Sequence, residues 1–186
     1  PDDIKKLAHD CLRDPQHISL ITERVAPESI EHYFAYVHPK QKNAELMKYL
    51  EGENVNQTLI FCNARHIVDT VFRSVGKNFK DIDYMHAGLG QDTRSSIIRK
   101  FRSQKLRYLI ASDVAGRGLD FSHVSHVINW DFPRDGEQYT HRTGRTGRMG
   151  RKGKAFTFVS KHDLSPLRKL IRSKKITPCW VGKDPL

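Results

Sequence analysis

Short apolar runs alternate with helical stretches along this sequence, and that alternation limits the folds open to the chain. The apolar runs, each bounded by turn-forming residues, span residues 58–62, 107–111, 124–129 and 155–159. We expect each run to form a buried strand. Helical periodicity occurs over residues 41–50, 64–75, 91–102 and 164–172. This alternation predicts an α/β fold, in which a parallel sheet carries helices on both faces. Because ligands bind beyond the carboxyl ends of such strands, we expect functional residues in the loops that follow them.

The charge balance favours a polyanionic partner. Lys and Arg total 32 against 21 Asp and Glu, which gives a formal net charge of +11 in 186 residues. A basic surface gains free energy from counterion release when it binds nucleic acid. The basic residues also cluster, since residues 141–161 contain seven Lys or Arg and no acid. Net charge alone leaves open a basic domain that binds nothing anionic.

Cysteine usage and hydropathy exclude several protein classes. The three cysteines, Cys11, Cys62 and Cys179, have no C-x-x-C spacing, which argues against a disulfide framework or a metal site. No run approaches the roughly 20 apolar residues of a membrane span, and the start shows no signal-peptide pattern. We therefore expect an intracellular protein in a reducing compartment, with no membrane partner. The sequence leaves cytoplasm and nucleus equally open.

Composition suggests three parts. Residues 1–24 contain a short amphipathic helix, a proline at position 15 and then a polar stretch, as expected for the end of a preceding domain and a linker. Residues 25–175 contain all the predicted strands and form the main domain. Residues 176–186 are expected to be a C-terminal tail.

The most distinctive pattern lies in residues 141–148. Arginines recur at every third position, at Arg142, Arg145 and Arg148, with glycines between them. The planar guanidinium pairs with phosphate oxygens, and glycine lets the backbone approach a ligand closely. Two such groups aimed at a γ-phosphate would stabilise charge on the transferring phosphoryl group. The alternative is a solvated basic loop, which does not account for the repeat.

A turn of small residues follows the second predicted strand. Ser112 and nearby backbone N–H groups could hold a phosphate, and the Asp113 carboxylate could accept hydrogen bonds from a ribose. Gly116 permits a sharp turn there. Helix or turn capping is the alternative role for Asp113 and Asp120.

Four motifs in this order resemble the helicase core of superfamily 2, in particular the C-terminal RecA-like domain of DEAD-box ATP-dependent RNA helicases. Residues 58–65 resemble motif IV, 91–94 the Q-x-x-R motif, 112–120 motif V and 141–148 motif VI. The His-Arg that opens the last motif separates it from related helicases that have glutamine there. The resemblance runs from about residue 25 to about residue 172 and implies a RecA-like, P-loop NTPase-like sheet. Residues 1–15 also resemble the last helix of the family's first RecA-like domain.

The resemblance also implies roles for individual residues. Arg145 and Arg148 would be finger arginines that reach the γ-phosphate, with His141 in the same catalytic group. Asp113 and Gly116 would line the ATP ribose site. Contacts to the first domain would come from His141, Arg117 and Arg142. The single-stranded RNA backbone would be bound by Arg65, Gly88, Gln91, Arg94 and Ser112.

What the chain lacks is equally informative. It contains no G-x-x-x-x-G-K-[ST] phosphate loop and no Asp-Glu-Ala-Asp sequence. The resemblance therefore implies that ATP and Mg²⁺ bind mainly to a separate N-terminal RecA-like domain, and that this chain alone has no ATPase activity. Some positions depart from the family pattern. Ala64 and Ser112 replace threonine, Gly116 replaces alanine or serine, and Thr143 replaces isoleucine.

Two other functions stay open. Residues 86–89 resemble a group of DNA-unwinding helicases, so a DNA helicase of the same superfamily is one alternative. A protein-binding platform, with partner proteins on the outer face of the sheet, is another.

Histidines and aromatic residues outside the motifs are interpreted as structural. His123 and His126 flank a predicted turn without a third metal ligand nearby, and we expect them to be solvated loop residues. Trp130, Phe132, Phe156 and Phe158 are expected in the core rather than stacked on bases.

Overall fold

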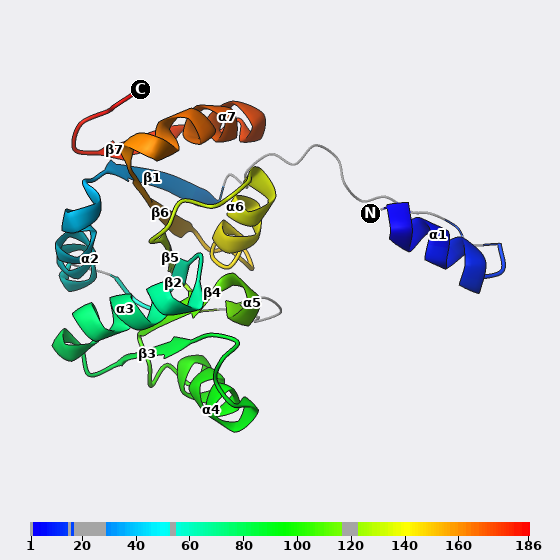
Figure 1. The fold of residues 1–186 in the computed structure, drawn as a ribbon, viewed down its shortest axis with the longest axis horizontal. Coiled ribbons are helices and arrows are strands. Elements are labelled where there is room, and N and C mark those ends of the chain that lie inside the picture. The colour runs from blue at the N-terminus through cyan, green and yellow to red at the C-terminus, as the bar shows by residue number, and fades with distance from the viewer. Residues whose placement is uncertain (1, 15, 17–28, 53–54, 117–122) are drawn as a thin grey trace.

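A seven-stranded parallel sheet forms the centre of the computed structural model, which describes residues 2–14, 16, 29–52, 55–116 and 123–186 (Figure 1). The strand order is β3-β4-β2-β5-β6-β1-β7. The strands are β1 (Ile30–Tyr36), β2 (Thr58–Cys62), β3 (Ile82–Met85), β4 (Tyr108–Ser112), β5 (His126–Asn129), β6 (Gly153–Val159) and β7 (Pro178–Val181). The α-helices are α1 (Asp2–Cys11), α2 (Lys42–Glu51), α3 (Arg65–Val75), α4 (Gln91–Arg102), α5 (Asp113–Gly116), α6 (Gly136–Thr143) and α7 (Leu164–Lys174). Short 3-10 turns occupy η1 (Pro39–Gln41), η2 (Gly76–Asn78) and η3 (Lys161–Asp163).

Helices cover both faces of the sheet, as the sequence predicts. Successive residues of a strand point to opposite faces, so Leu59 and Ile60 of β2 belong to different apolar clusters. The Ile60 face packs against α2 and α3, and the Leu59 face packs against α4 (Figure 1). α6 and α7 pack over β1 on this second face, through Tyr139 and Leu167.

The predicted strands and helices are confirmed, with boundaries that differ by two residues or fewer. β2 and α4 have the predicted bounds, whereas β6 begins two residues before the predicted strand. The sequence analysis missed β7 and α5, which have only four residues each. It also missed β1, β3 and α6, because polar residues interrupt their apolar pattern. His32 in β1 and Arg142 in α6 are examples, and both are buried.

β7 lies within the segment predicted to be a tail. It pairs in parallel with β1, in register from His32 with Pro178 to Ala35 with Val181. Trp180 packs against Phe34, with ring centroids 5.8 Å apart. The sheet therefore continues beyond residue 175.

His126 is a strand residue rather than a solvated loop residue, which corrects the prediction from sequence. It opens β5, which pairs with β2 on one side and β6 on the other, and only 6% of its surface is exposed. Burial lowers the pKa of His126 to about 4, and the charge of Lys154 adds to this effect. Trp130, Phe156 and Phe158 lie in the core, as expected, and Phe132 packs partly buried against α7.

Within the described residues, no helix has both the length and the apolar character needed to cross a membrane. The same part of the chain holds no group of three or more His, Cys, Asp or Glu arranged to bind a metal ion.

Candidate functional site

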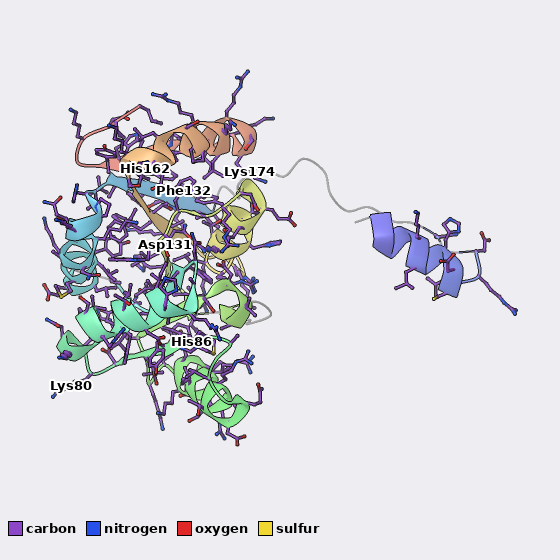
Figure 2. The ribbon with its side chains drawn as sticks, viewed as in Figure 1. Lys80, His86, Asp131, Phe132, His162 and Lys174 are labelled. Atoms are coloured by element: carbon purple, nitrogen blue, oxygen red, sulfur yellow. The ribbon has the colours of Figure 1, made fainter. Side chains whose placement is uncertain are left out.

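Polar residues from three neighbouring strands meet at the carboxyl edge of the sheet. Asn63 follows β2, Asp113 follows β4, and Asn129 and Asp131 belong to the end of β5 and the loop after it. β2 lies between β4 and β5, so the ends of these strands are adjacent. Asp131, which is labelled in Figure 2, also holds the loop after β2. Its Oδ2 accepts a hydrogen bond of 2.9 Å from the Asn63 backbone N–H.

Arg142 of α6 occupies the centre of this edge. Its Nε and Nη2 each donate to one Asp113 carboxylate oxygen, both at 2.7 Å. Nη2 also donates to Asn63 Oδ1 at 2.6 Å, and Nη1 donates to Asn129 Oδ1 at 3.3 Å and to the Asp131 carbonyl at 3.0 Å. A guanidinium has five N–H donors, so these bonds engage all of them.

Arg142 is one of the most deeply buried side chains of the domain. The residue is 1% exposed, and its guanidinium carbon lies 5.3 Å from the centre of the Phe61 ring. Every donor is engaged inside the domain, so the geometry makes Arg142 the residue that joins α6 to three strands. The contact with the first domain that the resemblance implies stays a prediction.

The rest of the arginine segment lies at the end of α6. Asp135 caps this helix by accepting a hydrogen bond of 2.7 Å from the Gln138 backbone N–H. Arg142, Thr143 and Thr146 are buried, whereas Arg145 and Arg148 are only half-buried. The repeat therefore separates into anchoring residues and residues that reach the surface.

Backbone carbonyls hold the two half-buried arginines in place. Arg145 Nε donates to the His141 carbonyl at 3.2 Å, and Arg148 Nε donates to the Gly144 carbonyl at 2.7 Å. His141 is exposed, with its Nε2 3.9 Å from Glu137 Oε1. Both guanidinium groups are thus tethered at Nε near the end of the same helix.

Gly147 lets the segment turn beside β1. Its φ is +68°, and a Cβ there would lie 2.6 Å from Ile30 Cγ1. A side chain at this position would push the segment away from the sheet.

The turn after β4 contributes Ser112 and Asp113. Ser112 is 6% exposed, and its buried Oγ has no hydrogen-bond partner. Both oxygens of Asp113 accept from Arg142, so the carboxylate proposed for the ribose also neutralises the buried guanidinium. Gly116 ends α5, while Arg117 and Asp120 lie outside the described residues.

A second group of predicted residues gathers at the ends of β2 and β3. Arg65 is the first residue of α3, and Gly88 lies in the loop after β3. A Cβ on Gly88 would lie 3.7 Å from Arg65 Nη1. The loop is held by His86, whose Nδ1 accepts from the Gly88 N–H at 3.0 Å and whose Nε2 lies 3.1 Å from Asp69 Oδ1 (Figure 2).

Gln91 and Arg94 are neighbours on the first turn of α4. Arg94 Nη1 donates to Gln91 Oε1 at 3.2 Å, while the buried Arg94 Nε has no hydrogen-bond partner. Gln91 thus contacts Arg94, and Arg65 lies beside Gly88. These are two separate contacts among the residues predicted to bind RNA.

Comparison with known proteins places this geometry in a family. Residues 41–150 match the family described as Helicase conserved C-terminal domain. The chain belongs to this family. Among curated proteins, the ATP-dependent RNA helicase DbpA of Bacillus subtilis is 38% identical over 160 residues, which are 86% of this chain and 33% of that protein.

Solved structures support the same family and identify a more specific group within it. S. cerevisiae Dbp5 bound to RNA and ADP BeF3 has a TM-score of 0.85 at 26% identity, over 97% of this chain and 49% of that one. The E. coli DEAD-box protein SrmB bound to RraA has a TM-score of 0.76 at 29% identity, over 88% of this chain and 94% of that one. The chain is thus the C-terminal RecA-like domain of a DEAD-box helicase, and it spans about a third of the length of the curated relative above.

Sequence reasoning missed three residues of this helicase domain that hold Arg142, namely Asn63, Asn129 and Asp131. Asn129 is fully buried although it lies in a strand whose other residues are mostly apolar. A polar amide in a buried strand needs a partner, and this was the available signal. Nothing in the sequence indicated that the partner would be Arg142.

Proposed function

We propose that this domain forms the C-terminal half of an ATP-dependent RNA helicase and closes on nucleotide that is bound by an N-terminal RecA-like domain. The proposal rests on the different burial of the three arginines in residues 141–148. Arg142 is buried with all five donors engaged, while Arg145 and Arg148, just beyond the end of the same helix, are half-buried. A rigid anchor below two surface arginines suits transition-state charge stabilisation, because such groups must be held in place before the reaction.

For the nucleotide, Arg145 and Arg148 would contact the γ-phosphate, and the hydrogen bonds from their Nε atoms to backbone carbonyls would hold both side chains near the end of α6. ATP supplies the phosphoryl group, and Mg²⁺, held by the other domain, would neutralise charge on its phosphates. Asp113 would reach the ribose only with lone pairs that Arg142 leaves unused. Exposed His141 would contact the N-terminal domain, and the same role for Arg117 remains a proposal from the sequence.

For RNA, we infer that Arg65, Gly88, Gln91, Arg94 and Ser112 bind the sugar-phosphate backbone. Arg65 and the exposed backbone of Gly88 lie together, and a small residue at position 88 leaves room for a phosphate beside the arginine. Ser112 Oγ and Arg94 Nε have no hydrogen-bond partner but are buried, so they would reach a phosphate only after the surrounding side chains move. Such contacts bind any sequence, since they do not read base edges.

The test measures phosphate release by this chain alone and by a protein in which it is joined to an N-terminal RecA-like domain. We expect no activity from the chain alone, and ATPase activity from the joined protein that RNA stimulates more than DNA of the same sequence. Stimulation by DNA alone would favour a DNA helicase, and ATPase activity of the purified chain would refute the half-enzyme proposal.

A further inference from the structure

A row of buried polar side chains continues from Arg142 across the sheet to β1. Arg142 donates to Asn129 Oδ1, and Asn129 Nδ2 donates to Thr157 Oγ1 at 3.0 Å. The Thr157 hydroxyl lies beside the hydroxyl of Tyr139, which is 2.6 Å from His32 Nδ1. We call these five residues the Arg142–His32 network.

Every member of the network is buried. His32 is 5% exposed, Tyr139 and Arg142 are 1% exposed, and Asn129 and Thr157 are fully buried. Buried polar groups destabilise a fold unless they are hydrogen-bonded, and an apolar row would fill the same space without that requirement. A polar row in the core therefore calls for an explanation beyond packing.

The Asn129 amide links Arg142 to the neighbouring strand, since it accepts from Arg142 and donates to Thr157. The Tyr139 hydroxyl and His32 Nδ1 share a hydrogen bond of 2.6 Å, and His32 Nε2 is buried without a partner. Hydrogen bonds in series polarise one another, so that each strengthens the next.

The network holds α6 at two points. Tyr139 and Arg142 lie three residues apart on this helix, and so on the same face. Tyr139 is hydrogen-bonded to His32 of β1 and lies beside Thr157 of β6, whereas Arg142 is bound to residues at the ends of β2, β4 and β5. Two points of attachment fix both the rotation and the position of the helix that carries Arg145 and Arg148 at its end.

We propose that Tyr139, Thr157 and Asn129 are positioning residues, which set the orientation of Arg142 and thereby the placement of Arg145 and Arg148. Their effect on catalysis rests on the proposed function, but their effect on Arg142 does not. The two effects therefore need separate measurements.

The first measurement uses this chain alone and the variant Tyr139→Phe, which removes one hydroxyl and keeps the ring. The matched control is Tyr108→Phe in β4, another fully buried tyrosine, whose hydroxyl donates to the Leu50 carbonyl at 2.8 Å. We follow solvent exchange of the Arg142 Nε–H by NMR and assign its signal by its loss in Arg142→Lys. We expect about fivefold faster exchange in Tyr139→Phe, from the loss of one hydrogen bond, and no change in Tyr108→Phe. Equal exchange in both variants would overturn the proposal.

The second measurement is steady-state ATP hydrolysis by the two-domain protein. We expect Tyr139→Phe to lower kcat about fivefold with little change in the KM for ATP, and Tyr108→Phe to change neither. A residue that only stabilises the fold would lower the melting temperature and leave kcat per folded molecule unchanged, and that result would refute the catalytic part. If the wild-type two-domain protein has no RNA-stimulated activity, the proposed function fails, while the exchange measurement still decides the network.

Thr157→Val removes the hydroxyl that accepts a hydrogen bond from Asn129. It tests the network independently and replaces Tyr139→Phe if that variant does not fold. It should reproduce the faster Arg142 exchange. Because both variants interrupt the same series, the double variant should exchange no faster than the more affected single variant. Additive effects would show that Tyr139 and Thr157 act separately, contrary to the proposal.

Discussion

Arg142 and Asp113 form a buried ion pair through two parallel hydrogen bonds, in which Nε and Nη2 each donate to a different carboxylate oxygen at 2.7 Å. Arg142 is 1% exposed, and the Asp113 side chain is 17% exposed. Asp113 thereby neutralises the only charge that α6 buries against the sheet edge in the described structure, and the planar fork supplies three further donors to Asn63, Asn129 and Asp131.

The first prediction concerns this pair. Arg142→Lys keeps the charge but removes the fork, leaving Asn63 Oδ1 or Asp113 without a donor. We expect the free energy of unfolding to fall by about 3 kcal/mol, because the substitution leaves buried acceptors without a donor. Urea denaturation of this chain measures the change. The control is Arg73→Lys on the exposed side of α3, which should change it by less than about 0.5 kcal/mol.

The second prediction concerns the surface arginines. In the two-domain protein, Arg145→Ala or Arg148→Ala should lower kcat about 10³-fold or more, because each group would act on transition-state charge. ATP affinity should change much less, and lysine should restore little activity because it lacks the fork. Melting temperatures measured on the same samples provide the control. A variant with unchanged turnover per folded molecule would remove that arginine from the mechanism.

The third prediction compares two arginines of the same helix. Arg65 begins α3 beside Gly88, whereas Arg73 lies two turns away near the other end. Arg65→Ala should weaken binding of single-stranded RNA at every sequence and reduce the salt dependence of log K by roughly 0.7, which corresponds to one phosphate contact on a single strand. Arg73→Ala should do neither. Fluorescence anisotropy at several salt concentrations measures both slopes, and equal slopes in the two variants would refute the assignment of Arg65.

The fourth prediction concerns acid stability. Burial lowers the pKa of both His32 and His126 from 6.5 to about 4, so in the folded state both stay neutral where the unfolded chain takes up protons. Stability is therefore lost as pH falls from about 6.5 to about 4, by up to about 3 kcal/mol for each histidine. Denaturation curves across this range should show the loss.

Replacing either buried histidine with glutamine should remove its share of that slope. His66→Gln, on the exposed side of α3, serves as the control and should leave the slope as it is in the wild type. A slope that is the same in all three variants would show that other groups cause the acid sensitivity.

Local pattern predicted much of the fold and of the candidate site. The runs 58–62 and 91–102 have the bounds of β2 and α4, because each has an uninterrupted period of one type. The turn after β4 was predicted to lie beyond the carboxyl end of a strand, where the structure has it, whereas the arginine segment forms the end of α6 and part of the connection to β6. β1 and α6 could not be predicted in this way, because His32 and Arg142 are buried polar residues in positions where an apolar residue marks the pattern.

The sequence by itself determined the alternation of strands and helices, the basic character of the chain and the identity of the residues at the sheet edge, since these depend on side-chain type and on neighbours a few positions away. Only the tertiary structure decided which arginine of the repeat is buried. Arg142, Arg145 and Arg148 have the same side chain and equal spacing, but α6 turns Arg142 alone toward Asn63, Asp113 and Asn129, which come from distant parts of the sequence. A guanidinium enters a core only where enough acceptors converge to engage its five donors, and that convergence exists only once β2, β4 and β5 lie side by side.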